Sequence, residues 1–224
     1  GIDKNKAHSI VNLTGNRVLI FWISNLFLVL GLLGIISISW LQQDFMVLKL
    51  MLLACALGYS YQGPPFRLGY QGLGEFICFI TFGPLAIAAV YYSQVHSFDL
   101  TLFAPAVIVG ISTSLILFCS HFHQVEDDLA AGKRSPIVRL GTGRGASILT
   151  VGVVSLYVLT VIFILLGLAP WLSSLIFLSL TLGLQLVNYV NEYHDQPIPI
   201  SSCKFIAVKL HFMSGILLAL GYIF

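Results

Sequence analysis

Long apolar stretches alternate with short polar ones along the whole chain. We count seven apolar segments of 17 to 23 residues, which is the length that a helix needs to cross the hydrocarbon of a bilayer. The segments are 18–40, 45–61, 76–92, 100–120, 146–168, 172–190 and 205–224. They are continuous runs without the alternation of a membrane β-barrel strand. The pattern therefore predicts an all-α, polytopic bundle with seven membrane spans.

The composition agrees with a membrane protein. Of the 224 residues 58% are hydrophobic and 9% are charged, whereas soluble domains carry roughly 25% charged residues. So few charges do not cover the surface of a soluble protein of this size. A soluble enzyme and a nucleic-acid-binding domain are excluded, and the lipid bilayer is the expected surrounding.

The charges gather on one side of the predicted membrane. If the first 17 residues lie on one face, that face also receives the connections 62–75, 121–145 and 191–204. Nine of the eleven basic residues fall there: Lys4, Lys6, Arg17, Arg67, Lys133, Arg134, Arg139, Arg144 and Lys204. The positive-inside rule makes this face cytoplasmic, or stromal in a plastid. Most acidic residues share the face, which predicts a polar site above an apolar cavity.

The densest charged segment is 121–136. Glu126, Asp127 and Asp128 are consecutive carboxylates after a membrane helix, and Lys133 and Arg134 follow closely. Carboxylates in small number favour Mg²⁺, which commonly bridges to phosphate oxygens. A carboxylate-bound metal beside Lys and Arg suits a diphosphate. A solvated loop of mixed charge is the alternative that this segment alone leaves open.

Two histidines stand at the start of the same segment. The spacing of His121, His123 and Glu126 matches no common zinc pattern. A histidine at a helix end is usually a capping or interfacial residue, so we assign these two no role.

A second segment, 59–75, combines glycines, prolines and aromatic residues. Arg67 is its one basic residue and is surrounded in sequence by Tyr61 and Tyr70. The functional interpretation is a loop that covers a ligand, with Arg67 on an anion and aromatic faces near a developing cation. An interfacial aromatic belt is an equally good alternative.

Three strings resemble one family. They are GIDKNK at 1–6, YQGPPFRLGYQGLGE at 61–75 and HQVEDDLAAGKRSPIVRLG at 123–141. Together they resemble the UbiA superfamily of intramembrane aromatic prenyltransferases, in its cyanobacterial and plastid branch that prenylates 1,4-dihydroxy-2-naphthoate. That family has nine helices and two Asp-rich motifs. The resemblance implies a single transmembrane prenyltransferase domain over 1–224 that lacks the first two helices and most of the first motif.

The resemblance also implies roles for individual residues. Mg²⁺ would be held by Asp128 with Glu126 or Asp127, and by Asp3 at the trailing edge of the first motif. The diphosphate would contact the basic residues Lys133, Arg134, Arg67 and Lys4. Tyr61 and Tyr70 would line the substrate site. Gln124 departs from the family's DxxxD pattern, which would place an Asp four residues before Asp128.

The implied reaction is transfer of a phytyl or other prenyl group from its diphosphate to dihydroxynaphthoate, with loss of the carboxylate. It would serve phylloquinone or menaquinone biosynthesis in a cyanobacterial plasma or thylakoid membrane, or a chloroplast membrane. Homogentisate, 4-hydroxybenzoate and chlorophyllide are alternative acceptors. A transporter is the alternative from a different class, although the spans show no clear internal repeat.

Overall fold

The computed structural model describes residues 14–223, and every regular element in that range is helical. In chain order the elements are α2 Arg17–Gln42, α3 Met46–Gln62, η2 Leu68–Gln71, α4 Gly74–Ile80, η3 Thr81–Leu85, α5 Ala86–Val95, η4 Leu100–Leu102, α6 Phe103–His121, α7 Val125–Ala130, α8 Pro136–Leu140, α9 Thr142–Leu165, η5 Trp171–Ser179, α10 Leu180–Tyr193, α11 Pro197–Ile200 and α12 Cys203–Ile223. The chain divides into two compact units, Gly1–Lys49 and Leu50–Phe224. All-α architecture is confirmed.

The first unit contains α2. The Asn16 side chain caps this helix by accepting a hydrogen bond from the Leu19 amide at 2.9 Å, and Gln43 ends it in the left-handed conformation. An Asn cap satisfies one of the amides that a helix start leaves without a partner. The helix carries no acidic residue in its first turn and no basic residue in its last. It is apolar all round, as expected of a helix in an apolar medium.

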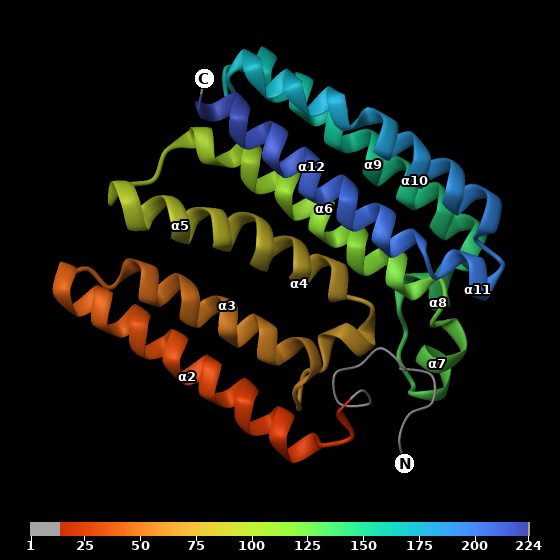
Figure 1. Cartoon of the computed structure of the whole chain (residues 1–224), viewed down its shortest axis with the longest axis horizontal. Helices are drawn as coiled ribbons and strands as arrows, with labels where there is room; N and C mark the ends of the chain where they lie inside the picture. Colours follow the sequence, from red (N-terminus) through yellow and green to blue (C-terminus); the bar gives the residue numbers. More distant parts are fainter. Residues whose placement is uncertain (1–13, 224) are drawn as a thin grey trace. The chain divides into compact units, whose positions relative to one another are not determined.

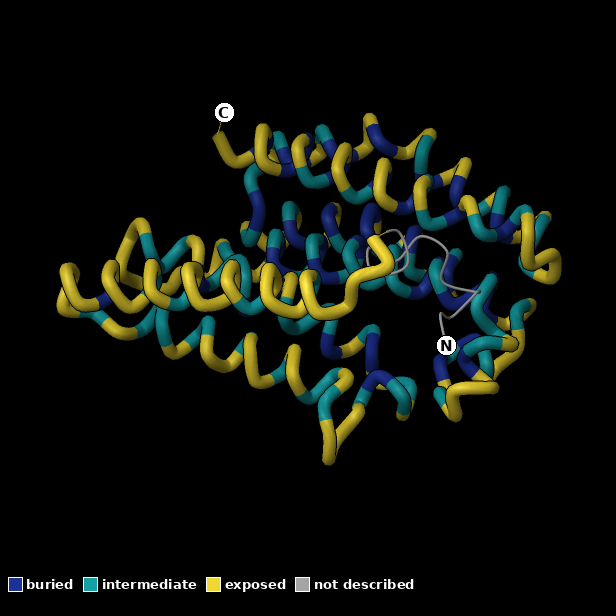
Figure 2. Tube along the Cα trace, turned by 60° about the horizontal axis from the view of Figure 1, so that its bottom comes forward, coloured by how far each residue is buried: buried dark blue, intermediate teal, exposed yellow. Residues whose placement is uncertain are grey.

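The second unit is a bundle in which α4, α5, α6, α9, α10 and α12 run side by side (Figure 1). Its core consists of apolar residues of α6, α9, η5, α10 and α12, with Leu149, Leu156, Ile176 and Leu186 fully buried. Figure 2 shows buried positions recurring along helices whose other positions are exposed. The exposed positions are largely hydrophobic too. An exterior of this kind suits contact with lipid.

The span that holds α4, η3 and α5 is widened where Pro84 lies inside it. Proline has no amide hydrogen and its ring clashes with the preceding turn, and the π-helical turn η3 accommodates both effects. Gly83 in the same turn lies against the backbone of α6, where a β-carbon would overlap the Ala106 carbonyl oxygen. The turn therefore lets this span and α6 approach closely.

The predicted spans coincide with helices. Six helical runs are long and apolar enough to cross a membrane: Arg17–Gln42, Gly74–Val95, Leu100–His121, Thr142–Leu165, Trp171–Tyr193 and Pro197–Ile223. The segment predicted at 45–61 forms the shorter apolar helix α3. The chain is thus a helical membrane protein, whose residues 14–223 hold six helical runs of spanning length and a seventh, shorter apolar helix of 17 residues.

The connections of the second unit lie at two opposite ends. Near one end the Tyr222 hydroxyl donates to the carbonyl oxygens of Thr101 and Leu168, at 3.2 and 3.4 Å. At the other end His194 Nδ1 lies 3.1 Å from Thr142 Oγ1, and the short helices α7, α8 and α11 gather there (Figure 1). The charged connections are therefore brought to one end of this unit, as the sequence predicts.

Candidate functional site

Two loops that the sequence singles out are held together at this end. The Arg134 amide donates to the Tyr70 carbonyl oxygen at 2.8 Å. The Arg139 guanidinium donates to the Arg134 carbonyl oxygen at 3.1 Å and to the Gln71 carbonyl oxygen. One arginine thus clamps the backbone of the loop before α4 to the backbone of the loop before α8. The prediction that 62–75 and 121–145 share one mouth is confirmed.

Gly72 makes this close approach possible. Its φ is +79°, a left-handed conformation that glycine adopts at little cost. A β-carbon at this position would lie 2.5 Å from the Arg134 carbonyl oxygen and 3.1 Å from Arg139 Nε. Any side chain at position 72 would therefore force the two loops apart.

A buried histidine lies between two carboxylates at the same place. His121 Nε2 is 3.2 Å from Glu75 Oε1, and His121 Nδ1 is 3.2 Å from Asp128 Oδ2. Lys133 Nζ lies 3.3 Å from Asp128 Oδ1 and 3.4 Å from His121 Nδ1. Glu75, His121, Asp128 and Lys133, which we call the charged cluster, thus join the start of α4, the end of α6, α7 and the following loop.

Asp128 is ionised readily despite its burial. Burial alone would raise the pKa of this carboxyl group, but the hydrogen bond with His121 and the charge of Lys133 outweigh it and hold the pKa below its ordinary value. The negative charge of Asp128 therefore persists well into the acid range. In this structure the ionised carboxylate is paired with Lys133 and His121.

The lowered pKa predicts how Asp128 contributes to stability. Since the pKa is lower in the folded protein than in the unfolded chain, where it is about 3.9, the ionised carboxylate favours folding above about pH 4. This contribution is lost as the pH falls through the folded-state pKa. Asp128→Asn should therefore melt below the wild type at pH 7, and the gap should close on acidification. Melting in detergent across pH 3–8 measures it, and a gap that widens at low pH would contradict the assignment.

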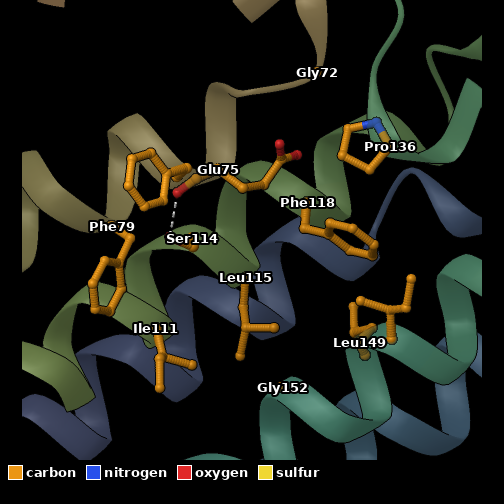
Figure 3. Close-up of a pocket in the computed structure, with 12 residues that line it drawn as sticks. Gly72, Glu75, Phe79, Ile111, Ser114, Leu115, Phe118, Pro136, Leu149 and Gly152 are labelled. Atoms are coloured by element: carbon orange, nitrogen blue, oxygen red, sulfur yellow. Dashed lines mark hydrogen bonds between the residues drawn. The ribbon is translucent and has the colours of Figure 1, made fainter. Parts of the chain in front are cut away.

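An apolar pocket opens beside the charged cluster. It has a volume of about 440 Å³ and is lined from α4, α6, the start of α8 and α9. Glu75 and Gly72 stand at one side, while Ile111 and Gly152 lie deeper along the helices (Figure 3). The Ser114 hydroxyl donates to the Glu75 carbonyl oxygen at 3.0 Å and ties α6 to the first turn of α4. The site thus combines ionised groups with an open apolar pocket, and a concave, mostly apolar surface with a few polar groups is the usual form of a small-molecule site.

The predicted site residues are only partly brought together. Asp128 and Lys133 are in contact, whereas Glu126 on the same short helix is exposed and Asp127 is half-buried. Residues two apart on a helix face different directions, which explains why Asp128 points inward and Glu126 outward. Arg134 is exposed and contributes its backbone to the loop contacts. Asp3 and Lys4 lie outside the described residues.

The aromatic and basic residues of the first loop are arranged around its turn. Arg67 has a left-handed φ of +45° and its guanidinium carbon lies 5.7 Å from the centre of the Tyr70 ring. Tyr61 on α3 packs so closely that a β-carbon at Gly74 would lie 2.9 Å from its ring. A second cavity of about 310 Å³ adjoins Tyr61, between α3, α4 and α6. These contacts support both a ligand-covering loop and an interfacial one.

Two members of the charged cluster were missed by sequence reasoning. His121 was assigned no role, yet it is buried and touches both carboxylates. Continuing α6 as a helix would place 121, 124 and 128 on one face; instead the helix ends at His121, and a turn folds Asp128 back onto it. Glu75 is a single acidic residue at the end of a glycine-rich loop, and the sequence pattern assigns it no role. The sequence feature that marks Glu75 is its position in the first turn of α4, immediately before the apolar residues of that helix.

A magnesium ion fits this site only in part. Among residues 14–223 no three His, Cys, Asp or Glu side chains are placed to hold a metal together. Asp128 offers one ionised carboxylate. Because Mg²⁺ in phosphate-transfer sites is commonly held by one or two protein carboxylates and the substrate phosphates, this donor set is compatible with a metal that arrives with a diphosphate.

Comparisons with known proteins agree with this geometry. The chain is 65% identical over 222 residues to the 2-carboxy-1,4-naphthoquinone phytyltransferase of Synechocystis, covering 99% of this chain and 72% of that protein. It is 41% identical to the chloroplastic 2-carboxy-1,4-naphthoquinone phytyltransferase of Arabidopsis thaliana, covering all of this chain and 60% of that protein. It is 29% identical to the 1,4-dihydroxy-2-naphthoate octaprenyltransferase of Haemophilus influenzae, over 51% of this chain and 42% of that protein.

No solved structure matches the chain. The UbiA prenyltransferase family matches residues 12–208, a stretch that holds both clamped loops, the charged cluster and the pocket. The chain therefore belongs to the UbiA prenyltransferase family.

Proposed function

We propose that this protein transfers a phytyl group from phytyl diphosphate to a 1,4-dihydroxy-2-naphthoate ring, the reduced form of 2-carboxy-1,4-naphthoquinone, with loss of the carboxyl group. The observation that carries the proposal is the charged cluster beside an apolar pocket in a membrane bundle. Two relatives named as phytyltransferases cover almost the whole chain at 65% and 41% identity. They favour phytyl as the donor group and a naphthoate as the acceptor.

The residues divide between the metal and the diphosphate in this proposal. Asp128, with Glu126 or Asp127 and with Asp3, would hold Mg²⁺, and the bound ion would supply positive charge that stabilises the departing diphosphate. The Lys133 ammonium group has three N–H donors. One contact with Asp128 leaves others that could bind diphosphate oxygens.

The remaining basic and aromatic residues serve the substrates. Arg134, Arg67 and Lys4 would add positive charge for the diphosphate. Tyr61 and Tyr70 would line the substrate site. Positive groups fixed before the bond breaks cost no reorganisation during the reaction.

The apolar surroundings have a second role. When the carbon–oxygen bond to diphosphate breaks, an allylic cation is left that water would capture. The pocket walls contributed by α4, α6 and α9 are largely apolar, so with the surrounding lipid they would limit the access of water and favour the aromatic ring as the nucleophile. The carbon–carbon bond then forms on the ring, the carbon–carboxylate bond breaks, and carbon dioxide leaves. The long isoprenoid chain would lie among the apolar helices and lipid.

The proposed location follows from the helices and the chloroplast relative. The protein would reside in a cyanobacterial plasma or thylakoid membrane, or in a chloroplast membrane. Its charged end would face the cytoplasm or stroma, because the basic residues concentrate there.

The test uses membranes that contain the protein, labelled phytyl diphosphate and either dihydroxynaphthoate or homogentisate. Labelled prenyl naphthoquinol, detected as the naphthoquinone after oxidation by air, is expected with the first acceptor only. Chelation of Mg²⁺ by EDTA is expected to lower the rate at least about 100-fold, and added Mg²⁺ should restore it. Product from homogentisate alone would overturn the choice of acceptor. Turnover that persists in EDTA would overturn the metal.

A further inference from the structure

The Glu75 carboxylate is buried, and its Oε2 oxygen has no hydrogen-bond partner in the part of the chain that the structure describes. Only 17% of its side chain is exposed, and both carboxylate oxygens are buried. Within residues 14–223 neither oxygen has a hydrogen bond of good geometry, although His121 Nε2 lies 3.2 Å from Oε1. Oε1 thus has the His121 ring as its ion-pair partner, while Oε2 has none among the described residues; a buried carboxylate oxygen without a donor is costly, and native proteins satisfy nearly all such groups. The missing donor is therefore expected from a ligand.

The pocket next to Glu75 limits what that ligand is. Aromatic rings of Phe76, Phe79 and Phe118 contribute to its walls, and Glu75 extends above Phe118 at its rim (Figure 3). Flat aromatic walls favour a flat aromatic guest by stacking. The pocket is closed below by aliphatic side chains such as Ile111.

The two parts of the prenyl donor do not suit Glu75. A diphosphate is an anion and a buried carboxylate repels it. An isoprenoid chain has no hydrogen-bond donor, so it would leave the carboxylate unsatisfied. An aromatic ring with hydroxyl groups supplies both the flat apolar body and the donor.

We propose that Glu75 binds the aromatic acceptor by accepting a hydrogen bond from one of its ring hydroxyl groups. This inference rests on the proposed function, and it assigns Glu75 and the adjoining pocket to the aromatic acceptor. A hydroxyl that donates to a carboxylate gains partial negative charge on its oxygen, which makes the neighbouring ring carbon a better nucleophile. Glu75 thereby both positions the ring and activates it.

The charged cluster sets the distance between the two substrates. His121 contacts Glu75 through Nε2 and Asp128 through Nδ1, so one imidazole ring separates the acceptor side from the diphosphate side. Holding two reactants at such close range replaces a bimolecular encounter with a bound geometry. His121 acts here as a positioning residue, because it touches the two carboxylates that bind the substrates.

The experiment compares two ligands that share the naphthoate ring and carry either hydroxyl or methoxy groups on carbons 1 and 4. Fluorescence titrations of the purified protein use 1,4-dihydroxy-2-naphthoate, kept reduced without oxygen, and its 1,4-dimethoxy analogue, which has no hydroxyl on those ring carbons. The wild type is expected to bind the dihydroxy compound at least about tenfold more tightly. In Glu75→Gln the preference should fall to about twofold or less, since the amide accepts a weaker hydrogen bond than a carboxylate.

A matched control and a second measurement complete the test. Glu192→Gln removes the same charge from an exposed position on α10 and should keep the wild-type preference. In turnover, Glu75→Gln should alter the KM for acceptor or kcat while the KM for phytyl diphosphate stays within about twofold.

Three outcomes would overturn the proposal: a wild type that binds neither ligand, a wild type without preference, or a Glu75→Gln protein that keeps the preference. Failure of phytyl transfer with intact preference would overturn the proposed reaction alone.

Discussion

Replacing Asp128 by asparagine is expected to lower prenyl transfer by about 10²–10³-fold, which is the range observed when one preorganised charged or polar group is removed from an active site. Asparagine keeps the shape of the side chain and loses the charge. The two basic neighbours of Asp128, His121 and Lys133, then face a neutral group, and a bound metal would lose the one buried carboxylate of this loop. The rate with saturating substrates and Mg²⁺ measures the effect.

Two companion variants sharpen this prediction. Asp99→Asn makes the same chemical change at the opposite end of the bundle, where Asp99 caps η4 by accepting from the Thr101 amide. Asparagine caps equally well, so full activity is expected there. Glu126→Gln tests the exposed carboxylate of the same helix and should cost less than Asp128→Asn. An Asp128→Asn protein that is folded at the assay temperature and retains more than about a tenth of the wild-type rate would remove Asp128 from the site.

Gly72→Ala is the second variant with a large expected effect. Alanine in the left-handed conformation costs about 1–2 kcal/mol by itself. At this position its β-carbon would also lie 2.5 Å from the Arg134 carbonyl oxygen, so the loops before α4 and α8 must separate. That separation weakens the Arg139 clamp and displaces Lys133 and Asp128 from Glu75. A displacement of about 1 Å at reacting groups lowers rates by about 100-fold.

Gly132→Ala provides the matched control. Gly132 has a similar φ of +69°, but a β-carbon there would meet nothing within 4 Å. It therefore carries the conformational cost without the overlap, and its rate should stay within about threefold of the wild type. Melting temperatures and rates of the two variants should be compared in the same detergent. Equal losses in both would show that the close approach of the two loops has no part in activity.

Much of the fold could be predicted because bilayer length and apolar continuity are properties of the sequence itself. The spans at 18–40 and 146–168 coincide with α2 and α9 within a few residues. The end of the helix before Asp128 could not be predicted in the same way. A helical continuation and a turn after His121 are equally consistent with the sequence, and only packing of His121 between two carboxylates decides between them.

The candidate site was predictable where charges are consecutive and hidden where they are isolated. Asp128 and Lys133 belong to a dense charged string, so the sequence alone marks them as candidates. Glu75 lies 53 residues before Asp128, and the sequence gives no measure of their proximity. The contact depends on how α4 packs against α6 and on the clamp made by Arg139, which are tertiary properties.

The pocket draws its polar rim and its apolar floor from different parts of the chain. Gly72 and Glu75 come from one loop and the first turn after it, whereas Ile111 and Gly152 belong to the middle of two long spans. Substitutions at the floor change the depth of the cavity and leave the ionised groups at its rim untouched. With the acceptor in this pocket as proposed, a few aliphatic substitutions at its floor would change which aromatic ring a homologous enzyme binds. The charged residues proposed to bind the diphosphate would stay the same.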